Sequence, residues 1–280
     1  MEKVLLVLAL AITGMITGCA SGPTEEDTSK KKAQLYYNQG TKELYLKEYT
    51  SALGKLLRAH KLDPENTDIQ SNLAMAYHFK GDNNRAIHHL RAAIELDEEN
   101  IDAKLNLATI YMKSNKLSEA KDMYHDILKS LTYSGQFRTH YNLSIIATKQ
   151  GRADLALEHL RKSVEIKEDY CPANFQMAKI YKQRRDFKRA YQYFKQAGLG
   201  VCYQRAEPFL GQIDVLIEQK KYGEASVKAE KLMERFALSK YESAIKNRLM
   251  KIKRLKQREA SQIEDLAVRE DGADFSSPDF

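Results

Sequence analysis

The sequence predicts an all-α protein built from repeated helical hairpins. A small residue recurs every 34 to 36 positions, and large apolar residues recur in step with it at the spacing of helix turns. The composition agrees with this prediction, because 43% of the 280 residues are hydrophobic and 30% are charged, as in a folded chain with a core. Three cysteines are too few for a disulfide-built mini-domain or a four-cysteine zinc site.

Residues 1–18 have the pattern of a secretion signal. Lys3 precedes an apolar run that starts at Val4, small residues follow up to Cys19, and the run is too short to span a bilayer. The segment from Ile16 to Cys19 resembles the lipobox of bacterial lipoproteins. The resemblance implies cleavage before Cys19, a diacylglycerol on its sulfur and an acyl chain on its new amino group. The alternative is an ordinary signal peptide with a chance cysteine at its end.

Residues 19–32 are polar and rich in turn-forming residues, which suits a lipidated tether. Ala20, rather than an aspartate, follows Cys19. By resemblance to lipoprotein sorting in bacteria with two membranes, this residue predicts a protein that is lipid-anchored in the outer membrane and faces the periplasm.

Six alanines mark the repeat, at successive spacings of 34, 34, 36, 34 and 35 residues. A large apolar side chain follows four positions after each of the first five. The alanines are Ala52, Ala86, Ala120, Ala156, Ala190 and Ala225, and the side chains that follow are Leu56, Leu90, Tyr124, Leu160 and Phe194.

A second set of small residues lies twelve positions before four of these alanines. In three of the four units, a tyrosine follows the small residue by three positions. The small residues are Ala74, Ala108, Ser144 and Ala178, and the tyrosines are Tyr77, Tyr111 and Tyr181. Gly81 and Gly151 fall between the two sets and are the expected turns of their hairpins.

This pattern resembles the tetratricopeptide repeat, whose small positions let two antiparallel helices pack closely. The resemblance covers residues 33–238 in six units and implies a superhelix of six helical hairpins. The end units depart from it, since Gly40 holds the small position in the first unit and Ile213 replaces it in the sixth. Such departures are expected at the ends of a solenoid.

Residues 239–267 keep a helical pattern and predict a basic capping helix over the last repeat. Ser239 would be its N-cap, with Glu242 completing a capping box. The chain from 239 to 260 holds eight Lys or Arg against two Glu, which could attract phosphate, but a solvated helix is the simpler interpretation. Residues 268–280 predict a disordered acidic tail.

The resemblance places the first helix of each unit along a concave face, and four units carry asparagine at the sixth position of that helix. These amides predict a ladder that suits the main chain of an extended peptide, although each could instead satisfy local backbone. The four are Asn38, Asn72, Asn106 and Asn142, followed by Gln176 and Gly211. Further groove candidates are Met75, His78, Phe79, Leu105, Met112 and Phe175, with Tyr37, Tyr45, Tyr141, Ile145, Lys179 and Lys182 beside them; Tyr37 and Tyr141 could be core instead.

Enzyme motifs are absent from the sequence: there is no HExxH, no GxSxG and no glycine-rich phosphate loop. His88 and His89 have no carboxylate or cysteine at ligand spacing, and the segment from Asp97 to Asn100 lacks the glycine and final glutamate of a calcium loop. We therefore expect no catalysis, cofactor, metal, small-molecule substrate or nucleic-acid partner.

Cys171 opens the fifth unit and Cys202 closes it, 31 residues later. The two ends of a helical hairpin lie side by side, so the pair could fall within disulfide range, and an oxidising compartment would favour the bond. The alternative is two small buried thiols.

The whole chain resembles one family more than others, the type IV pilus biogenesis lipoproteins or pilotins. Besides the lipobox and six repeats, the resemblance is carried by the segments Ser134–Phe137, Tyr170–Ala173, Tyr191–Phe194 and Phe209–Phe236. The capping helix and acidic tail after Tyr241 depart from the family. The resemblance implies a scaffold whose groove binds an outer-membrane secretin subunit and promotes its localisation and multimerisation for pilus assembly.

Two other functions stay open on the sequence. A lipoprotein adaptor for peptidoglycan hydrolases or proteases would use the same anchor and the same repeats. A scaffold for envelope or exopolysaccharide assembly is suggested by the fold alone.

Overall fold

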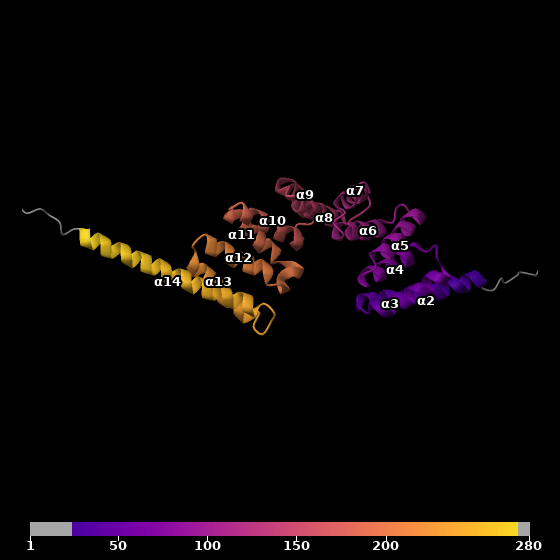
Figure 1. Ribbon diagram of the computed structural model, residues 1–280, viewed down its shortest axis with the longest axis horizontal. Coiled ribbons are helices and arrows are strands. Elements are labelled where there is room, and N and C mark those ends of the chain that lie inside the picture. The colour runs from indigo at the N-terminus through magenta and orange to yellow at the C-terminus, as the bar shows by residue number, and fades with distance from the viewer. Residues whose placement is uncertain (1–23, 274–280) are drawn as a thin grey trace, which may run out of the picture. The chain divides into compact units, whose positions relative to one another are not determined.

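The computed structural model describes residues 24–273, with side chains up to Leu266, and all its regular structure is helical (Figure 1). The chain divides into two compact units, residues 1–123 and 124–280, and the division falls inside helix α7. The expected signal segment, residues 1–18, and the expected lipidation site, Cys19, lie outside the described residues. None of the described helices is both long enough and apolar enough to cross a bilayer.

Helical hairpins follow one another along the chain, as the repeat predicts. Unit 1 holds α2 (Glu25–Tyr45) with α3 (Tyr49–Leu62), α4 (Thr67–Phe79) with α5 (Asn83–Leu96), and then α6 (Ile101–Lys113) and the start of α7 (Leu117–Ile127). Unit 2 holds α8 (Gln136–Lys149) with α9 (Ala153–Ile166), α10 (Cys171–Gln183) with α11 (Phe187–Ala197), the short 3₁₀ helix η1 (Gly200–Gln204), α12 (Glu207–Glu218) with α13 (Tyr222–Arg235), and α14 (Glu242–Ala273).

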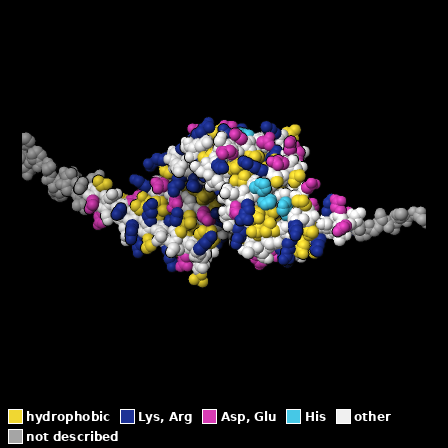
Figure 2. Space-filling view, turned by 45° about the vertical axis from the view of Figure 1, so that its right-hand side comes forward, with side chains coloured by type: hydrophobic (Ala, Val, Ile, Leu, Met, Phe, Trp, Pro, Cys, Tyr) yellow, Lys and Arg dark blue, Asp and Glu magenta, His cyan; other side chains and the backbone are white. Residues whose placement is uncertain are grey.

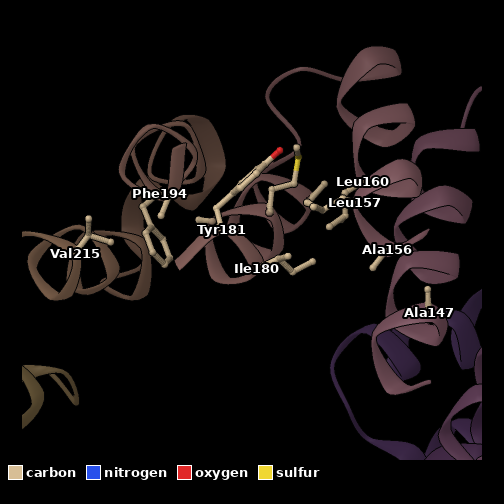
Figure 3. Packing of buried hydrophobic residues seen from close by; sticks show 12 residues of the cluster. Ala147, Ala156, Leu157, Leu160, Ile180, Tyr181, Phe194 and Val215 are labelled. Atoms are coloured by element: carbon tan, nitrogen blue, oxygen red, sulfur yellow. The ribbon is translucent and has the colours of Figure 1, made fainter. Parts of the chain in front are cut away.

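The predicted small positions form the core of the hairpins. All six alanines of the main register are fully buried, and so are Leu56, Leu90, Tyr124 and Leu160 four residues after the first, second, third and fourth of them. In unit 2 the side chains of neighbouring helices meet in one cluster, which includes Leu160, Tyr181 and Phe194 (Figure 3). An alanine leaves the space that lets a large side chain of the adjacent helix reach the centre, which explains why the two sizes recur together.

Each hairpin turn contains one residue in the left-handed region of backbone conformation. The prediction for Gly81 and Gly151 is confirmed, with φ of 87° and 73°. The other four hairpins place a side-chain-bearing residue there, at φ of 59° to 64°: Lys47, Asn115, Arg185 and Lys220. These six residues follow the same 34, 34, 36, 34 and 35 spacing as the buried alanines, so the turn geometry belongs to the repeat even where glycine is missing.

The first helix begins earlier than the sequence predicted. Thr24 caps α2 by accepting a hydrogen bond from the Asp27 backbone N–H, while the Asp27 carboxylate accepts one from the Thr24 backbone N–H. This capping box starts the helix at Glu25. Residues 25–32 are therefore helical, which corrects the expected tether boundary at residue 32.

The capping helix exists, but its predicted N-cap is wrong. The helix α14 starts at Glu242, and the Ser239 hydroxyl instead donates to the Phe236 carbonyl in the preceding turn. The Glu242 carboxylate accepts the Leu238 backbone N–H, so it holds that turn rather than a helix starting at 239. The side chains of Ile245 and Ile252 are buried against α12 and α13.

The same helix also runs further than expected. It continues to Ala273, so residues 268–273, predicted as part of a disordered tail, are helical, and residues 274–280 lie outside the described part. Every side chain from Lys256 to Leu266 is exposed, because this part of α14 extends past the last repeat hairpin (Figure 1).

Candidate functional site

The predicted asparagine ladder is divided between the units. Asn38, Asn72 and Asn106 belong to unit 1, and Asn142 belongs to unit 2. Asn38 is exposed and its side-chain oxygen accepts a hydrogen bond from Gln34 at 2.9 Å. The Asn72 amide donates to the Thr41 hydroxyl at 2.8 Å, so this member uses a donor within the protein.

Tyr37 joins the same group, because its hydroxyl lies in hydrogen-bond contact with Thr41 and Asn72. Burial raises the pKa of Tyr37, and Asp68 adds to the rise, while the two hydrogen bonds act against it. This arrangement supports the packing role considered for Tyr37.

The other groove candidates of unit 1 differ in exposure. Met75, Leu105 and Met112 are half-buried, whereas Phe79 is 44% exposed and stacks on Tyr49 with ring centroids 4.7 Å apart. Tyr45 is 87% exposed, so Tyr45 and Phe79 are the exposed aromatic candidates of unit 1.

His78 has both ring nitrogens in contact with polar neighbours. Its Nδ1 lies 2.6 Å from the Asn83 side-chain oxygen, and its Nε2 lies 3.2 Å from the Lys113 ammonium. Because a lysine ammonium can only donate, Nε2 accepts and Nδ1 donates to Asn83. This fixes the tautomer of the ring.

In unit 2, three of the predicted groove residues line one cavity. Phe175, Lys179 and Lys182 project from α10 into a space of about 570 Å³ that we call the α10–α12 pocket. Its apolar wall also includes Phe194 of α11 and Leu210 of α12. The first helices of two successive repeats thus form a pocket with an aromatic floor and a basic rim.

Gly211 explains how this pocket keeps its shape. It stands at the ladder position of the sixth unit, where the other units carry an amide. A Cβ atom at Gly211 would overlap the ring of Phe194, so glycine is required for α11 and α12 to pack this closely. Gly211 interrupts the series of amides in the sequence, and in the structure it makes the close contact that brings the Phe194 ring to the pocket wall.

The capping helix α14 contributes an ion pair at the edge of the pocket. The Arg248 guanidinium of α14 makes two hydrogen bonds to the Asp214 carboxylate of α12, at 2.7 and 2.8 Å, and the Lys182 ammonium lies 3.7 Å from the same carboxylate. Lys179 on the rim is exposed. Sequence reasoning missed Asp214 and Arg248, although their separation of 34 residues equals one repeat and could have suggested the pair.

Glu207 lines the same pocket. Its Oε1 accepts hydrogen bonds from Tyr241 at 3.2 Å and Arg205 at 3.4 Å, whereas its Oε2 is buried and has no partner among the described residues. Burial raises the pKa of Glu207, but the hydrogen bonds and Arg205 outweigh it, so its pKa is lowered and the carboxylate stays charged. Because Oε2 is enclosed, the Glu207 carboxylate is part of the pocket wall rather than an open acceptor.

A smaller cavity continues the groove toward α8. It has a volume of about 230 Å³, it shares Phe175 and Glu207 with the α10–α12 pocket, and it adds Tyr141 and Gln176. The Tyr141 hydroxyl is in hydrogen-bond contact with Gln176, the fifth member of the predicted ladder. Together the two cavities form an elongated depression along the first helices α8, α10 and α12, which we call the unit 2 groove.

The structure confirms the predicted disulfide. Cys171 and Cys202 are bonded, with their Cα atoms 6.3 Å apart, and both line the smaller cavity. The bond ties the start of α10 to η1, so one wall of the unit 2 groove is held by a covalent link. Among the described residues, no group of three or more His, Cys, Asp or Glu side chains is placed to hold a metal ion.

The comparisons agree with this architecture. Models of the tetratricopeptide repeat match residues 80–131, 137–170 and 172–197. No curated protein matches the sequence. The matched models are all of one repeat type, which serves protein–protein contact.

Solved structures of similar fold include PilF and PilW. PilF of Pseudomonas aeruginosa is 19% identical, with 79% of this chain and 99% of that chain covered and a TM-score of 0.65. PilW, described as a widely conserved type IV pilus biogenesis factor, is 19% identical, with 76% and 97% covered and a TM-score of 0.65. The Cut9–Hcn1 assembly of the APC/C is 14% identical, with 89% and 45% covered and a TM-score of 0.61.

At these identities the likeness concerns the fold. The repeat register, the buried alanines and the matched models agree on it. Residues 80–131, 137–170 and 172–197 match tetratricopeptide repeats, which form protein–protein interaction scaffolds, and the all-α chain that contains them is similar in fold to PilF and PilW.

Proposed function

We propose that this protein is an outer-membrane-anchored scaffold that binds a secretin subunit in the unit 2 groove and promotes its multimerisation during type IV pilus assembly. The observation that carries the binding part is the aromatic floor and basic rim of the α10–α12 pocket. An extended segment can place an apolar side chain against Phe175 and Phe194. The likeness in fold to a pilus biogenesis factor supports the choice of partner.

The anchor would follow from lipidation of Cys19, as the lipobox resemblance implies. Two or more acyl chains hold a protein on a membrane where one does not. Confinement to that surface raises the effective concentration of the groove toward membrane-bound subunits, which favours assembly without any new contact.

The test of the partner is deletion of the gene. We expect loss of pilus fibres and of heat-stable secretin multimers, and rescue of both by the wild-type chain. Intact multimers in the deletion strain would contradict the proposal. Capture of peptidoglycan hydrolases or proteases without secretin would favour the adaptor function instead, and loss of surface polysaccharide with intact pili would favour the envelope scaffold.

The test of the groove is a pair of matched substitutions. Lys179→Glu changes an exposed lysine on the rim of the α10–α12 pocket, and Lys188→Glu makes the same charge change at an exposed lysine of α11 that does not line it. We expect Lys179→Glu to reduce secretin capture by the purified chain and Lys188→Glu to leave it unchanged. Equal capture by the two variants would place the binding surface elsewhere.

The test of the anchor is metabolic labelling with a lipid precursor. We expect label on the wild-type chain and none on Cys19→Ala, which should also leave the membrane fraction. A label that survives this substitution would show that the lipid is attached at another residue.

A further inference from the structure

A second large cavity of unit 2 shares no lining residue with the unit 2 groove. It has a volume of about 680 Å³ and lies between η1, the start of α12 and the exposed side of α13, and we call it the α13 pocket. Its walls include Tyr203, Phe209, Val227, Lys228, Lys231 and Arg235. Because α13 is the second helix of its hairpin, this pocket is separate from the surface used by the first helices.

The aromatic wall of the α13 pocket is already ordered. The Arg235 guanidinium lies over the Tyr203 ring, 3.3 Å from its centroid, and 4.9 Å from the centroid of Phe209, and it donates a hydrogen bond to the Tyr203 carbonyl. Tyr203 directly follows Cys202, so the disulfide to Cys171 holds this wall in place. A guest would lose little free energy in ordering these side chains.

The pocket shows apolar surface that the fold does not cover. Tyr203 is 51% exposed and Val227 is 52% exposed, while Val201 in η1 is 89% exposed. Aromatic and arginine side chains around a concave apolar surface are typical of sites that dominate binding energy between proteins. A concave surface can accept a side chain inserted from a partner. A surface that binds a bilayer would instead carry apolar side chains that protrude into the lipid.

The charge of the pocket selects an acidic guest. Three cations line it, Lys228, Lys231 and Arg235, against the single carboxylate of Glu224. On the face shown in Figure 2, by contrast, basic and acidic side chains are interspersed over the repeats. The chemistry that fits is therefore an extended segment with an aromatic side chain next to a carboxylate.

The chain itself contains such a segment. Residues 274–280 hold two Asp-Phe pairs, Asp274-Phe275 and Asp279-Phe280, and the sequence after residue 263 has six acids and one arginine. We propose that the α13 pocket binds residues 274–280 of a second copy of this chain, through insertion of a phenylalanine beside a carboxylate that pairs with Lys231 or Arg235.

The length of α14 bears on whether residues 274–280 bind the pocket of their own chain or that of a second copy. Leu255 is the last residue of α14 that packs on the hairpin of α12 and α13, and the helix continues for 18 residues to Ala273. At 1.5 Å per residue this is about 27 Å. Seven residues span at most about 25 Å when fully extended, so the segment would have to lie fully extended back along α14 merely to come level with Leu255, which favours the pocket of a second copy.

The first test measures self-association of the full mature chain by sedimentation over a range of concentrations. We expect reversible association that weakens at least tenfold in Lys231→Glu and equally in the double variant Phe275→Ser with Phe280→Ser. Lys253→Glu is the matched control, since Lys253 is an exposed lysine of α14 outside the pocket, and it should associate like the wild type. A monomeric wild-type chain, or association that none of these changes affects, would overturn the proposal.

The second test uses a fluorescent peptide of residues 268–280 with the full-length double Phe→Ser variant, because the tails of this variant lack both phenylalanines and do not compete with the peptide for the pocket of another copy. We expect saturable binding that is lost in Lys231→Glu and is at least tenfold weaker for a peptide with serine at both phenylalanines. Equal binding of the serine peptide would show that charge alone drives it, which overturns the proposal. Binding to phosphatidylglycerol vesicles that needs Lys231, with no peptide binding, would reassign the surface to lipid and also overturn it.

Discussion

Unit 1 and unit 2 contain the same repeat, but their cavities are built differently. Unit 1 has two cavities, of about 580 and 570 Å³, that are lined only by residues of the hairpins, such as Tyr49 and Phe79 in the first and Tyr77 in the second. Each of the three cavities described in unit 2 also takes a residue from an element that the repeat does not contain: Arg248 from α14, Tyr203 from η1 and Cys202 from η1.

The difference shows where specificity is added to a repeat fold. Buried alanines and their large neighbours are common to both units, so they explain why the hairpins stack and not what they bind. The additions in unit 2 are a disulfide, a short 3₁₀ helix and a capping helix, and they fix side chains around apolar space. If these additions, rather than the repeat, make unit 2 distinct, removing them should change unit 2 and leave unit 1 unaffected.

The largest expected effect is on the disulfide. Replacing Cys171 and Cys202 by serine removes a link that closes 31 residues, which corresponds to about 3–4 kcal/mol of unfolding free energy in the chain-entropy model. We expect hydrogen exchange to become faster at the amides of α10 to α13 and to stay unchanged at the amides of α2 to α5. Equal acceleration in both regions would mean that the units do not unfold independently.

A methyl group at two glycines should have opposite effects. Gly211→Ala forces a Cβ into the Phe194 ring and should destabilise unit 2 by about 1–3 kcal/mol. Gly54→Ala lies within α3 of unit 1, where a Cβ would meet no atom within 4 Å, and should stabilise by about 0.5–1 kcal/mol. Denaturant unfolding of each variant measures both changes, and a stabilising Gly211→Ala would contradict the packing described for the groove.

Acid should lower the free energy of unfolding of both units, because the folded form of each unit keeps a histidine neutral. Burial lowers the pKa of His89 in unit 1 to about 4, with His60 and His88 adding to the effect, and burial lowers the pKa of His140 in unit 2 to about 4, with His159 adding to it. A folded pKa below the unfolded value of about 6.5 means that the unfolded chain binds more protons between pH 6.5 and 4. Stability is then complete above pH 6.5 and falls as the pH drops through that range.

The measurement is hydrogen exchange of each unit at pH 7.5 and 5.0, corrected for intrinsic rates. His89→Gln should reduce the loss on acidification in unit 1 alone, and His140→Gln should reduce it in unit 2 alone, each by on the order of 1–2 kcal/mol after allowance for partial solvation. Unchanged pH profiles in both variants would show that other groups control the acid response.

The smallest expected effect concerns the hairpin turns. Lys47→Gly in unit 1 and Arg185→Gly in unit 2 remove a side chain from a left-handed backbone conformation. Each substitution should raise the free energy of unfolding of its unit by up to about 1 kcal/mol. Gly81→Ala and Gly151→Ala should destabilise by about the same amount. Thermal unfolding measures all four, and a difference between units would show that the turns are not equivalent.

The sequence predicted the hairpins, two of the six turns and the disulfide, because each leaves a local signal. A buried alanine must recur with the repeat, a glycine marks a left-handed turn, and two cysteines at the ends of one hairpin must lie close together. The start of α14 was wrong because a Ser-x-x-Glu pattern is compatible with more than one turn, and the Leu238 backbone N–H competes for the Glu242 carboxylate.

The site was predicted only in part. Phe175 was expected at a regular groove position and lines the α10–α12 pocket, whereas Asp214, Arg248 and Glu207 reach the pocket through contacts between separate elements. Asn72 was expected to offer its amide to a peptide, but its donor is used by Thr41. Which polar groups stay free depends on neighbours that a periodic pattern does not identify.

The amino-acid sequence was enough to establish a series of paired helices with small residues at their contacts. Positions that are buried in every repeat must hold small or apolar residues, so the residue types recur with the repeat. The tertiary structure alone decided which gaps between those helices stay open and which charges surround them. That decision depends on atoms brought together from distant segments, such as Phe194 against Gly211 and Arg248 against Asp214.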